Sequence, residues 1–391
     1  MKKVIILGST GSIGKSLLKI ISKNINLYKI ELLTVKKNYL ELFKQAKKFN
    51  VKNVILTDKK IFNLHKKKFE DNKINIFNNY NNLNKFLNKR VDYVMSSIVG
   101  LDGLLPTINL IKYTKNIAIA NKETIICAWD LIEKNLKRHN TNFVPVDSEH
   151  FSIFHALNKS KKSNQVQKIY LTASGGPLLN VPLNRYKKIK INQVIKHPNW
   201  NMGKKISVDS STMMNKVFEV IEAKKIFNLN YNQLNILIHP DSYIHAIVEF
   251  KNKMISIIAH DTTMEIPIFN SINNNLNYFS NSTKLDIKKL NKLSLMPVDI
   301  KKFPLIKIIN LLPNRNTLFE TVLVSANDEL VNLFLEKKIK FTDISSKLLK
   351  IVKIKEFALM KKKYPKNIKD ILKVNNYVSS KVKAMCNKNV K

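Results

Sequence analysis

Two separate stretches of this 391-residue chain carry carboxylates that could bind a divalent cation. Asp147 and Glu149 follow an apolar run. In extended chain, residues two apart point the same way, so these two carboxylates can face one point. Glu219 supplies a third carboxylate from a separate stretch. With no thiolate nearby in the sequence, carboxylate oxygens favour Mg²⁺ or Mn²⁺ over zinc. A lone Asp-x-Glu pair is common on protein surfaces, so a solvated turn is the alternative for Asp147 and Glu149.

A phosphate could bind the stretch that contains Glu219, which reads HPNWNMGKKISVDSSTMMNKVFEVIE. We expect a helix that begins at SVDSST and is capped by Asp209 or Ser210, and a helix N-terminus attracts anions. Asn215 and Lys216 lie four and three residues before Glu219. The amide, the ammonium and the carboxylate therefore share one helix face.

The loop before this helix carries Trp200 among Asn, Met and Gly residues, without apolar periodicity. An exposed Trp in such a loop suits a lid over substrate, and a contact with a satellite core is the alternative. A small-residue turn at 172–177 (TASGGP) follows a predicted strand. It can present hydroxyl and N–H groups to an anion.

The N-terminal residues have the pattern of a dinucleotide site. Residues 3–7 read as a buried strand, the glycine turn 8–14 (GSTGSIG) follows at once, and an amphipathic helix comes next. Glycines permit the tight turn and let backbone N–H groups approach a pyrophosphate. The second strand, 30–35, ends in the tripeptide 36–38 (KKN), where an NAD site would place an acidic residue. Cationic and amide groups suit a 2′-phosphate, so NADP is favoured, although lysines are abundant throughout the chain.

The remaining pattern predicts an α/β protein with a helical C-terminal region. Strands near 53–56, 93–96 and 117–120 complete an open, mostly parallel sheet. The last of them leads into the tripeptide 121–123 (NKE), at the sheet edge where ligands bind. Further strands are predicted at 143–146, 168–171, 235–239, 246–250 and 255–259, and helices at 326–335 and 344–352.

The net charge of +40, taken alone, would indicate a nucleic-acid or anionic-membrane partner. Only four of the 68 basic residues are Arg, and the lysines are spread along the chain. Proteins that bind nucleic-acid phosphates favour Arg and cluster their positive charge on one face. We interpret the charge as solvated surface and expect no nucleic-acid partner. Two distant cysteines argue against a disulfide scaffold or a zinc site, and no run approaches the ~18 apolar residues of a membrane span. We expect a cytoplasmic protein without a membrane partner.

These motifs together resemble the 1-deoxy-D-xylulose 5-phosphate reductoisomerase family of the non-mevalonate isoprenoid pathway. The resemblance rests on GSTGSIG, NKE, PVDSEH, TASGGP and HPNWNMGKKISVDSSTMMNKVFEVIEA in family order, and continues through SANDE and FTDI. It implies an N-terminal Rossmann-like NADPH domain at 1–147, a central catalytic and dimerisation domain at 148–275 with a flap near 197–205, a linker at 276–300, and a C-terminal helical bundle at 301–391. It also implies a homodimer that acts on a sugar phosphate.

The resemblance further implies the roles of individual residues. The metal ligands would be Asp147, Glu149 and Glu219, and the catalytic residues Glu149, Lys122 and His197. The substrate would contact Lys122, Ser148, Glu149, Ser174, His197, Trp200, Ser210, Asn215, Lys216 and Glu219. NADPH would contact Gly8, Thr10, Gly11, Ser12, Ile13, Lys37, Asn38, Asn121, Glu123 and Gly203. Mg²⁺ or Mn²⁺ would be the metal, with Co²⁺ as a further option.

The implied reaction converts 1-deoxy-D-xylulose 5-phosphate to 2-C-methyl-D-erythritol 4-phosphate, by skeletal rearrangement at the metal and hydride transfer from NADPH. Another NADP-linked alcohol or aldehyde dehydrogenase acting on a sugar phosphate is the alternative. The chain departs from the family pattern at Lys36, Phe151, Asp241 and in 263–268 (TMEIPI). These departures concern the packing or the dimer contacts of the central domain more than the reaction, because every implied metal and phosphate position is intact.

Overall fold

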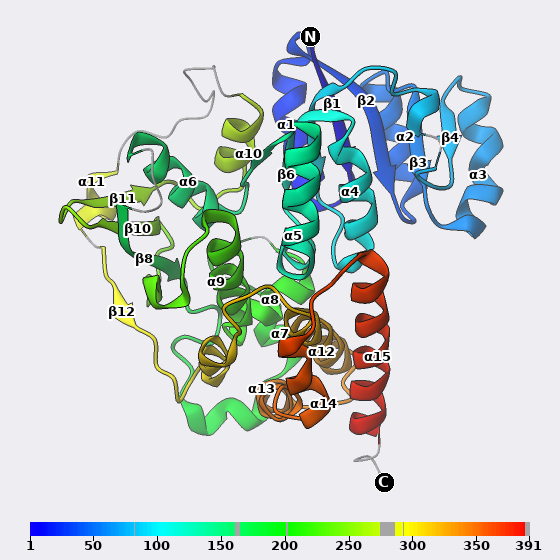
Figure 1. Cartoon of the computed structure of the whole chain (residues 1–391). Helices are drawn as coiled ribbons and strands as arrows, with labels where there is room; N and C mark the ends of the chain where they lie inside the picture. Colours follow the sequence, from blue (N-terminus) through cyan, green and yellow to red (C-terminus); the bar gives the residue numbers. More distant parts are fainter. Residues whose placement is uncertain (82, 161–164, 201, 274–285, 292, 388–391) are drawn as a thin grey trace. The chain divides into compact units, whose positions relative to one another are not determined.

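The computed structural model describes residues 1–81, 83–160, 165–200, 202–273, 286–291 and 293–387 (Figure 1). These residues form two compact units, each with its own core. The first unit contains residues 1–124, 130–147 and, at its late end, those from 264 to 273. The second unit contains residues 125–129, 148–263 and the described residues from 286 onwards.

A seven-stranded parallel sheet forms the core of the first unit, in the order β4-β3-β2-β1-β5-β6-β7. Its strands are β1 (Lys2–Leu7), β2 (Tyr28–Val35), β3 (Asn53–Leu56), β4 (Asn75–Phe77), β5 (Val91–Ser96), β6 (Thr114–Ile119) and β7 (Asn142–Val144). Residues 4–7 of β1 are fully buried, as expected for a parallel sheet with both faces covered. Strand β1 lies between β2 and β5, so the strand order reverses there, and sheets of this kind bind ligands beyond the carboxyl ends of the strands at such a point. The predicted parallel sheet is confirmed.

Helices connect these strands and cover the sheet (Figure 1). They are α1 (Ser12–Lys23), α2 (Tyr39–Lys48), α3 (Lys59–Glu70), α4 (Leu104–Ile111) and α5 (Lys122–His139). A later helix, α10 (Glu265–Ile272), packs against α1, where Lys19 pairs with Glu265. The hydroxyl oxygens of Tyr93 and Ser271 also lie 2.6 Å apart. Residues 264–273 thus pack in the first unit, whereas the predicted catalytic domain runs to 275.

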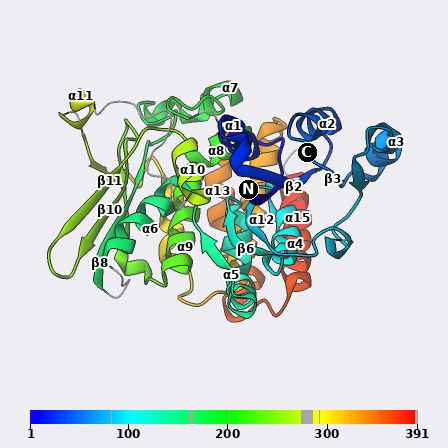
Figure 2. The same cartoon turned by 90° about the horizontal axis from the view of Figure 1, so that it is seen from above.

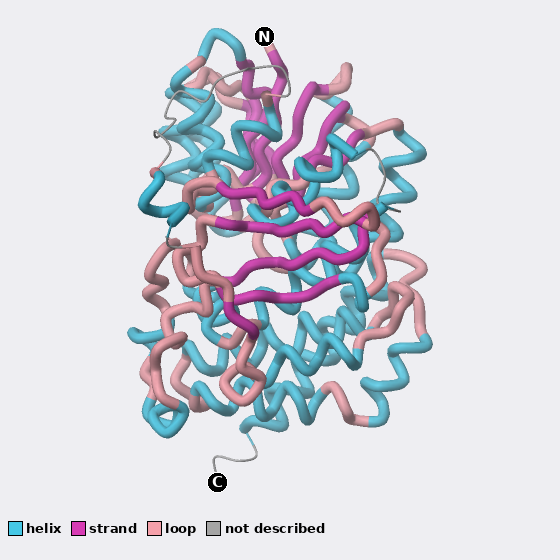
Figure 3. The backbone as a smooth tube through the Cα atoms, turned by 90° about the vertical axis from the view of Figure 1, so that its left-hand side faces the viewer, coloured by secondary structure: helices cyan, strands magenta, loops and turns pink. Residues whose placement is uncertain are grey.

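A five-stranded mixed sheet lies in the second unit, in the order β11-β10-β8-β9-β12 (Figure 3). Strands β8 (Val166–Ala173) and β9 (Leu234–Ile238) are parallel, and β10 (Ile244–Phe250), β11 (Ile255–Ala259) and β12 (Met296–Pro297) run antiparallel to their neighbours. Helices α6 (Ser148–Ser160) and α9 (Met214–Phe227) cover one face (Figure 2). Ile153 and Val220 pack there against Ile169 and Val248.

The C-terminal residues of the second unit confirm the predicted helical region. Its main helices are α12 (Phe319–Leu335), α13 (Phe341–Ile351) and α15 (Ile368–Asn387), and α12 packs against both others. Helix α8 (Lys204–Ser211) packs against α9 and α12. Residues 276–285 and 292 of the predicted linker lie outside the described residues, and α11 (Ile287–Asn291) lies within its described part. None of the helices in the described ranges is both long enough and apolar enough to cross a bilayer.

Candidate active site

Asp147, Glu149 and Glu219 meet at the start of helix α6. Each offers one carboxylate oxygen, and the three oxygens lie within 4.8 Å of one another. Helix α6 begins at Ser148, so Glu149 lies in its first turn and Asp147 just precedes it. The extended geometry that we expected for Asp147 and Glu149 is therefore wrong. The two carboxylates converge because the chain turns into a helix between them, and α9 brings Glu219 to the same point.

Two lysines neutralise these carboxylates. Lys216 Nζ lies 2.8 Å from Glu149 Oε1 and also pairs with Glu219, and Lys122 pairs with Asp147. Burial by itself lowers the pKa of Lys216, but the charges and hydrogen bonds of Glu149 and Glu219 outweigh burial. The pKa of Lys216 is therefore raised above its usual value, and its side chain carries a positive charge at neutral pH.

The three carboxylates fit Mg²⁺ or Mn²⁺. Mg²⁺ binds oxygen at about 2.1 Å in octahedral geometry, so oxygens that share one ion lie roughly 3–4 Å apart. The carboxylate oxygens here are within 4.8 Å of one another, so small side-chain movements bring them to that spacing. Asn215 Nδ2 donates to Glu219 Oε1 and Ser148 Oγ donates to Glu149 Oε2, each at 2.5 Å. These two hydrogen bonds orient the carboxylates toward a common point.

Sequence reasoning missed two polar residues beside these carboxylates, His150 and Glu222. Ligand atoms of Asp147, His150 and Glu222 also lie within 4.8 Å of one another, and both missed side chains are buried. His150 Nε2 lies 2.9 Å from the carbonyl oxygen of Glu219, so it donates a hydrogen bond there. Spacing could have revealed both, because His150 follows Glu149 directly and Glu222 lies one helical turn after Glu219.

His197 connects the predicted flap with Ser174. Its Nδ1 accepts hydrogen bonds from the backbone N–H groups of Asn199 and Trp200, both at 3.1 Å, so Nδ1 carries no proton. Its Nε2 therefore carries the proton and donates to Ser174 Oγ at 2.9 Å. The backbone N–H of Gly176 donates to the same hydroxyl at 3.0 Å. Burial lowers the pKa of His197 to about 4, so the ring is neutral at pH 7.

The helix that we expected to begin at SVDSST is two helices, α8 and α9, which meet at Met213. Met213 has a left-handed backbone, with φ of 62°, at the N-cap of α9. The predicted cap by Asp209 or Ser210 is therefore wrong, because both residues lie in the last turn of α8. The Asp209 carboxylate instead accepts hydrogen bonds from Lys205 Nζ at 2.9 Å and Asn327 Nδ2 at 2.8 Å.

Ser210 lies beside the turn that carries Ser174. A Cβ atom on Gly176, whose φ is 66°, would lie 3.0 Å from the carbonyl oxygen of Ser210 and 3.2 Å from its Oγ. This close approach and the left-handed backbone both favour glycine. Two predicted phosphate contacts, the hydroxyls of Ser174 and Ser210, therefore both lie close to Gly176. The other two, Asn215 and Lys216, contact Glu219, and their contacts with phosphate stay predictions.

The glycine turn after β1 has the geometry of a dinucleotide site. Gly8 has φ of 79°, and a Cβ atom there would lie 2.8 Å from the carbonyl oxygen of Ser97. Gly11 is the N-cap of α1, Thr10 precedes it, and Ser12 and Ile13 form the first turn. Because Gly11 has no side chain to cap the helix, the first N–H groups of α1 can bind a phosphate.

The other predicted NADPH contacts lie after strands β2 and β6 and at the start of α8. Lys37 and Asn38 are exposed after β2, and Asn38 Oδ1 caps α2. Asn121 Oδ1 caps α5 by accepting from the N–H of Thr124 at 2.7 Å, and Glu123 is buried in the first turn of α5. Gly203 is the N-cap of α8. Asn38 and Asn121 thus stabilise helices, and the contacts of these residues with NADPH stay predictions.

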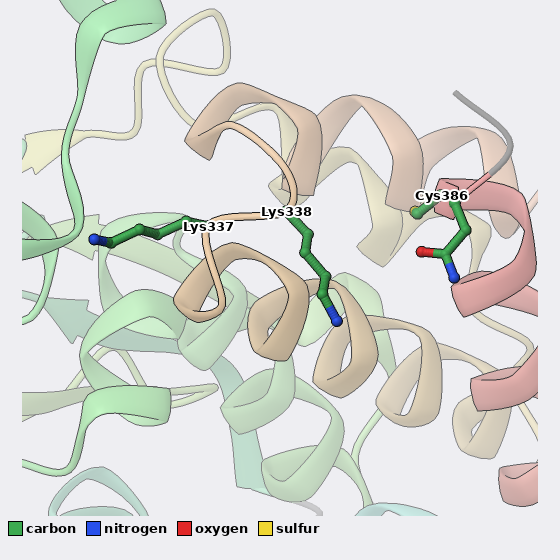
Figure 4. Close-up of a pocket in the computed structure, with 4 residues that line it drawn as sticks. Lys337, Lys338 and Cys386 are labelled. Atoms are coloured by element: carbon green, nitrogen blue, oxygen red, sulfur yellow. The ribbon is translucent and has the colours of Figure 1, made fainter. Parts of the chain in front are cut away.

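A hollow of about 450 Å³ lies among the C-terminal helices (Figure 4). Lys337 and Lys338 line it from the turn after α12, and Cys386 and Asn387 line it from the end of α15. The described lining contains none of the predicted site residues. This hollow therefore has no part in the site built around the carboxylates.

The whole chain is similar to known 1-deoxy-D-xylulose 5-phosphate reductoisomerases. Family models match residues 4–129 (1-deoxy-D-xylulose 5-phosphate reductoisomerase), 143–227 (its C-terminal domain) and 261–380 (DXP reductoisomerase C-terminal domain). The reductoisomerase of Pelagibacter ubique (strain HTCC1062) is 57% identical over 387 residues, covering 98% of this chain and 100% of that protein. That of Sulfurihydrogenibium sp. (strain YO3AOP1) is 39% identical over 349 residues, covering 89% and 90%.

Solved structures agree with these sequence matches. A crystal structure of DOX-P reductoisomerase in complex with NADPH, fosmidomycin and magnesium has a TM-score of 0.91 at 30% identity, covering 99% of this chain and 98% of that chain. The Zymomonas mobilis enzyme in complex with NADPH has a TM-score of 0.87 at 29% identity, covering 98% and 99%. The chain therefore belongs to the 1-deoxy-D-xylulose 5-phosphate reductoisomerase family.

Proposed function

We infer that this protein converts 1-deoxy-D-xylulose 5-phosphate to 2-C-methyl-D-erythritol 4-phosphate, with NADPH as reductant and a divalent metal ion. One observation carries the proposal: oxygens of Asp147, Glu149 and Glu219 lie within 4.8 Å of one another in a chain that matches the family over 98% of its length. An ordinary NADP-linked dehydrogenase has no use for three converging carboxylates.

NADPH is the reductant that the first unit fits. Two reductoisomerase structures similar to this chain were solved with NADPH. In this chain, the uncapped first turn of α1 suits the pyrophosphate. Lys37 and Asn38 follow β2, where an enzyme for NAD would place an acidic residue against the ribose. A positive charge at that point favours the 2′-phosphate of NADPH.

A divalent ion held by Asp147, Glu149 and Glu219 would polarise the carbonyl and a neighbouring hydroxyl of the substrate during the rearrangement. A similar reductoisomerase structure contains magnesium. Ser148 and Asn215 keep two of the carboxylates oriented by hydrogen bonds. The Lys122 ammonium, beside Asp147, can stabilise negative charge that develops on a substrate oxygen.

The substrate phosphate would bind at Ser174 and Ser210. Ser174 Oγ accepts hydrogen bonds from His197 Nε2 and from the N–H of Gly176, so its own O–H is directed toward a further acceptor. Neutral His197 thereby sets the direction in which the hydroxyl donates. The phosphate is remote from the reacting carbons, so its binding would orient the substrate and close the flap that carries Trp200.

We also propose a homodimer formed through the open face of the five-stranded sheet. On β11, Ile255 and Ile257 are 61% and 54% exposed, and the adjacent Met254 is 66% exposed. Ile257 pairs with Ile247 of β10 on this face, while α6 and α9 pack on the opposite face. A group of exposed apolar side chains on a sheet is typical of a surface that another chain covers.

The test of the proposed reaction is the metal requirement of NADPH oxidation. Oxidation should need both 1-deoxy-D-xylulose 5-phosphate and Mg²⁺ or Mn²⁺, and it should stop when EDTA is added. Folded protein that shows no oxidation with both present would refute the proposal. Turnover of a sugar phosphate in EDTA would instead favour the ordinary dehydrogenase.

A further inference from the structure

Four aromatic rings of the second unit form a continuous column, made of Trp200, His245, His260 and Phe151. Trp200 meets His245 edge-on, with ring centroids 6.1 Å apart and planes at 71°. His245 stacks on His260 at 3.7 Å and 16°. His260 in turn meets Phe151 at 6.0 Å and 65°. The column therefore connects the predicted flap with the first turn of α6, which also carries Glu149.

A backbone carbonyl holds one nitrogen of each histidine ring in this column. His245 Nε2 lies 3.1 Å from the carbonyl oxygen of His260, and His260 Nδ1 lies 2.9 Å from that of Asp261, so both nitrogens donate. The register of β10 and β11 shifts at His245, between Ile244 and Ala246, and such an irregularity re-aims one side chain. His245 is 1% exposed. The carbonyl bond holds only one edge of the His245 ring, so the tilt of the ring plane depends on the stacking with His260.

The flap has separate anchors for its backbone. The N–H of Trp200 donates to His197 Nδ1 at 3.1 Å. Asn199 Nδ2 donates to the carbonyl oxygen of Pro240 at 2.6 Å and to Ser242 Oγ at 3.0 Å. These bonds fix where the flap backbone begins, but they leave the Trp200 indole free to turn about its side-chain bonds. The edge-on contact with the His245 ring fixes the orientation of the indole.

We propose that His260 is a positioning residue for the reaction. By stacking on His245 it holds the ring on which the Trp200 indole docks, and so it sets the position of the flap over the substrate. The proposal rests on the proposed function, in which Trp200 covers the bound sugar phosphate. One aromatic pair is worth about 0.5–1.5 kcal/mol, which at 1.4 kcal/mol per factor of ten is about 2- to 12-fold in an equilibrium.

The experiment uses the full chain with Trp129→Phe, which leaves Trp200 as its one tryptophan, because the chain has two. His260→Ala should raise the acrylamide quenching of Trp200 fluorescence. It should also raise KM for the sugar phosphate about 2- to 12-fold, with a smaller change in kcat. His260→Asn, which keeps a donor for the Asp261 carbonyl but has no ring, should do the same. His260→Phe keeps a ring and should restore both values.

His155→Ala is the matched control, because exposed His155 meets Phe151 rather than the flap side of the column. It should leave the quenching of Trp200 unchanged. Unchanged quenching in folded His260→Ala or His260→Asn would overturn the proposal, and so would a failure of His260→Phe to restore it. Quenching needs neither substrate nor NADPH. A protein without reductoisomerase activity would therefore refute the proposed function while the quenching still decides whether His260 positions Trp200.

Discussion

At pH 7 the His197 ring is uncharged, and it links the predicted flap to Ser174 by hydrogen bonds. Its Nδ1 accepts two flap N–H groups, and its Nε2 donates to Ser174. A proton on Nδ1 would break both flap hydrogen bonds, and burial already disfavours the charged ring by lowering the pKa of His197 to about 4. The placement of the predicted flap and the direction of the Ser174 hydroxyl therefore depend on the same uncharged side chain.

We predict that the contribution of His197 to the free energy of unfolding falls as the pH drops from 6.5 to about 4. In this window the unfolded ring binds a proton and the folded ring does not, so protonation favours the unfolded state. Above pH 6.5 both rings are neutral and the contribution is fully present. Urea unfolding at about pH 7 and about pH 5 should show a larger loss of stability for the wild type than for His197→Asn. Equal losses would contradict this prediction.

A second prediction at this scale concerns Glu219. Glu219→Gln keeps the size of the side chain and an oxygen for Asn215, but it removes the negative charge of a proposed metal ligand. Metal-dependent turnover should fall by more than about 100-fold. Removing a group that only hydrogen-bonds to a metal ligand already lowers metal affinity or activity about 10- to 100-fold, and loss of the ligand itself should cost more. NADPH affinity, measured by fluorescence titration, should stay unchanged. Glu249→Gln on β10 is the control, and full turnover in Glu219→Gln would remove Glu219 from the metal site.

At the scale of elements, helix α12 supports the helix that carries Ser210. Asn327 Nδ2 of α12 donates to Asp209 Oδ1 of α8 at 2.8 Å, and Asn327 and Asp209 are 0% and 1% exposed. Lys205 Nζ lies 2.9 Å from both Asp209 and Asp328. The C-terminal helices therefore hold a proposed phosphate-binding element in place, although they contribute none of the carboxylates.

Asn327→Ala should lower the free energy of unfolding by about 1.5–3 kcal/mol, because it removes a buried hydrogen bond to a charged group. It should also raise KM for the sugar phosphate, since α8 loses part of its support. Guanidinium unfolding checks the first effect and steady-state kinetics the second. Asn332→Ala, at an exposed position of the same helix, should change stability by less than about 0.5 kcal/mol. A similar loss in both variants would show that the effect is not specific to Asn327.

The elements that could be predicted from the sequence are those with a strong local pattern. Strands β3 and β11 have the predicted bounds, because Asn53–Leu56 and Ile255–Ala259 are short apolar or alternating runs. The break between α8 and α9 could not be predicted, since no Gly or Pro marks it. Met213 adopts its left-handed backbone while packed in a cluster with Ile238 and Phe303, which come from distant parts of the sequence.

The same limit applies to the site. The motifs identified Asp147, Glu149 and Glu219, but their convergence depends on where α6 begins, which the apolar run before it does not show. The stacking of His245 on His260 required the pairing of β10 with β11 and its register shift. Contacts set by strand pairing and by helix junctions are tertiary, and one sequence does not contain a local signal for them.

For the whole molecule, we predict that the open sheet face controls oligomeric state. Ile257→Asp would bury an unpaired charge in the proposed dimer, so the dissociation constant should rise at least about tenfold. Sedimentation velocity over a range of concentrations measures this shift. Leu64→Asp is the control, because Leu64 on α3 is 76% exposed and lies in the first unit. Equal sedimentation of both variants would exclude this face as the interface.

The Lys216 ammonium pairs with Glu149 and Glu219, which are both proposed metal ligands. A divalent ion bound by these carboxylates would compete with Lys216 for them and leave more of its three N–H donors for the proposed phosphate contact. The two ligands should then bind cooperatively, each tightening the other by one common factor, since such coupling is reciprocal and is typically about 5- to 150-fold. A sugar without a phosphate would therefore bind more weakly for two reasons. It would lack the phosphate contacts, and the metal ion would bind less tightly in its presence.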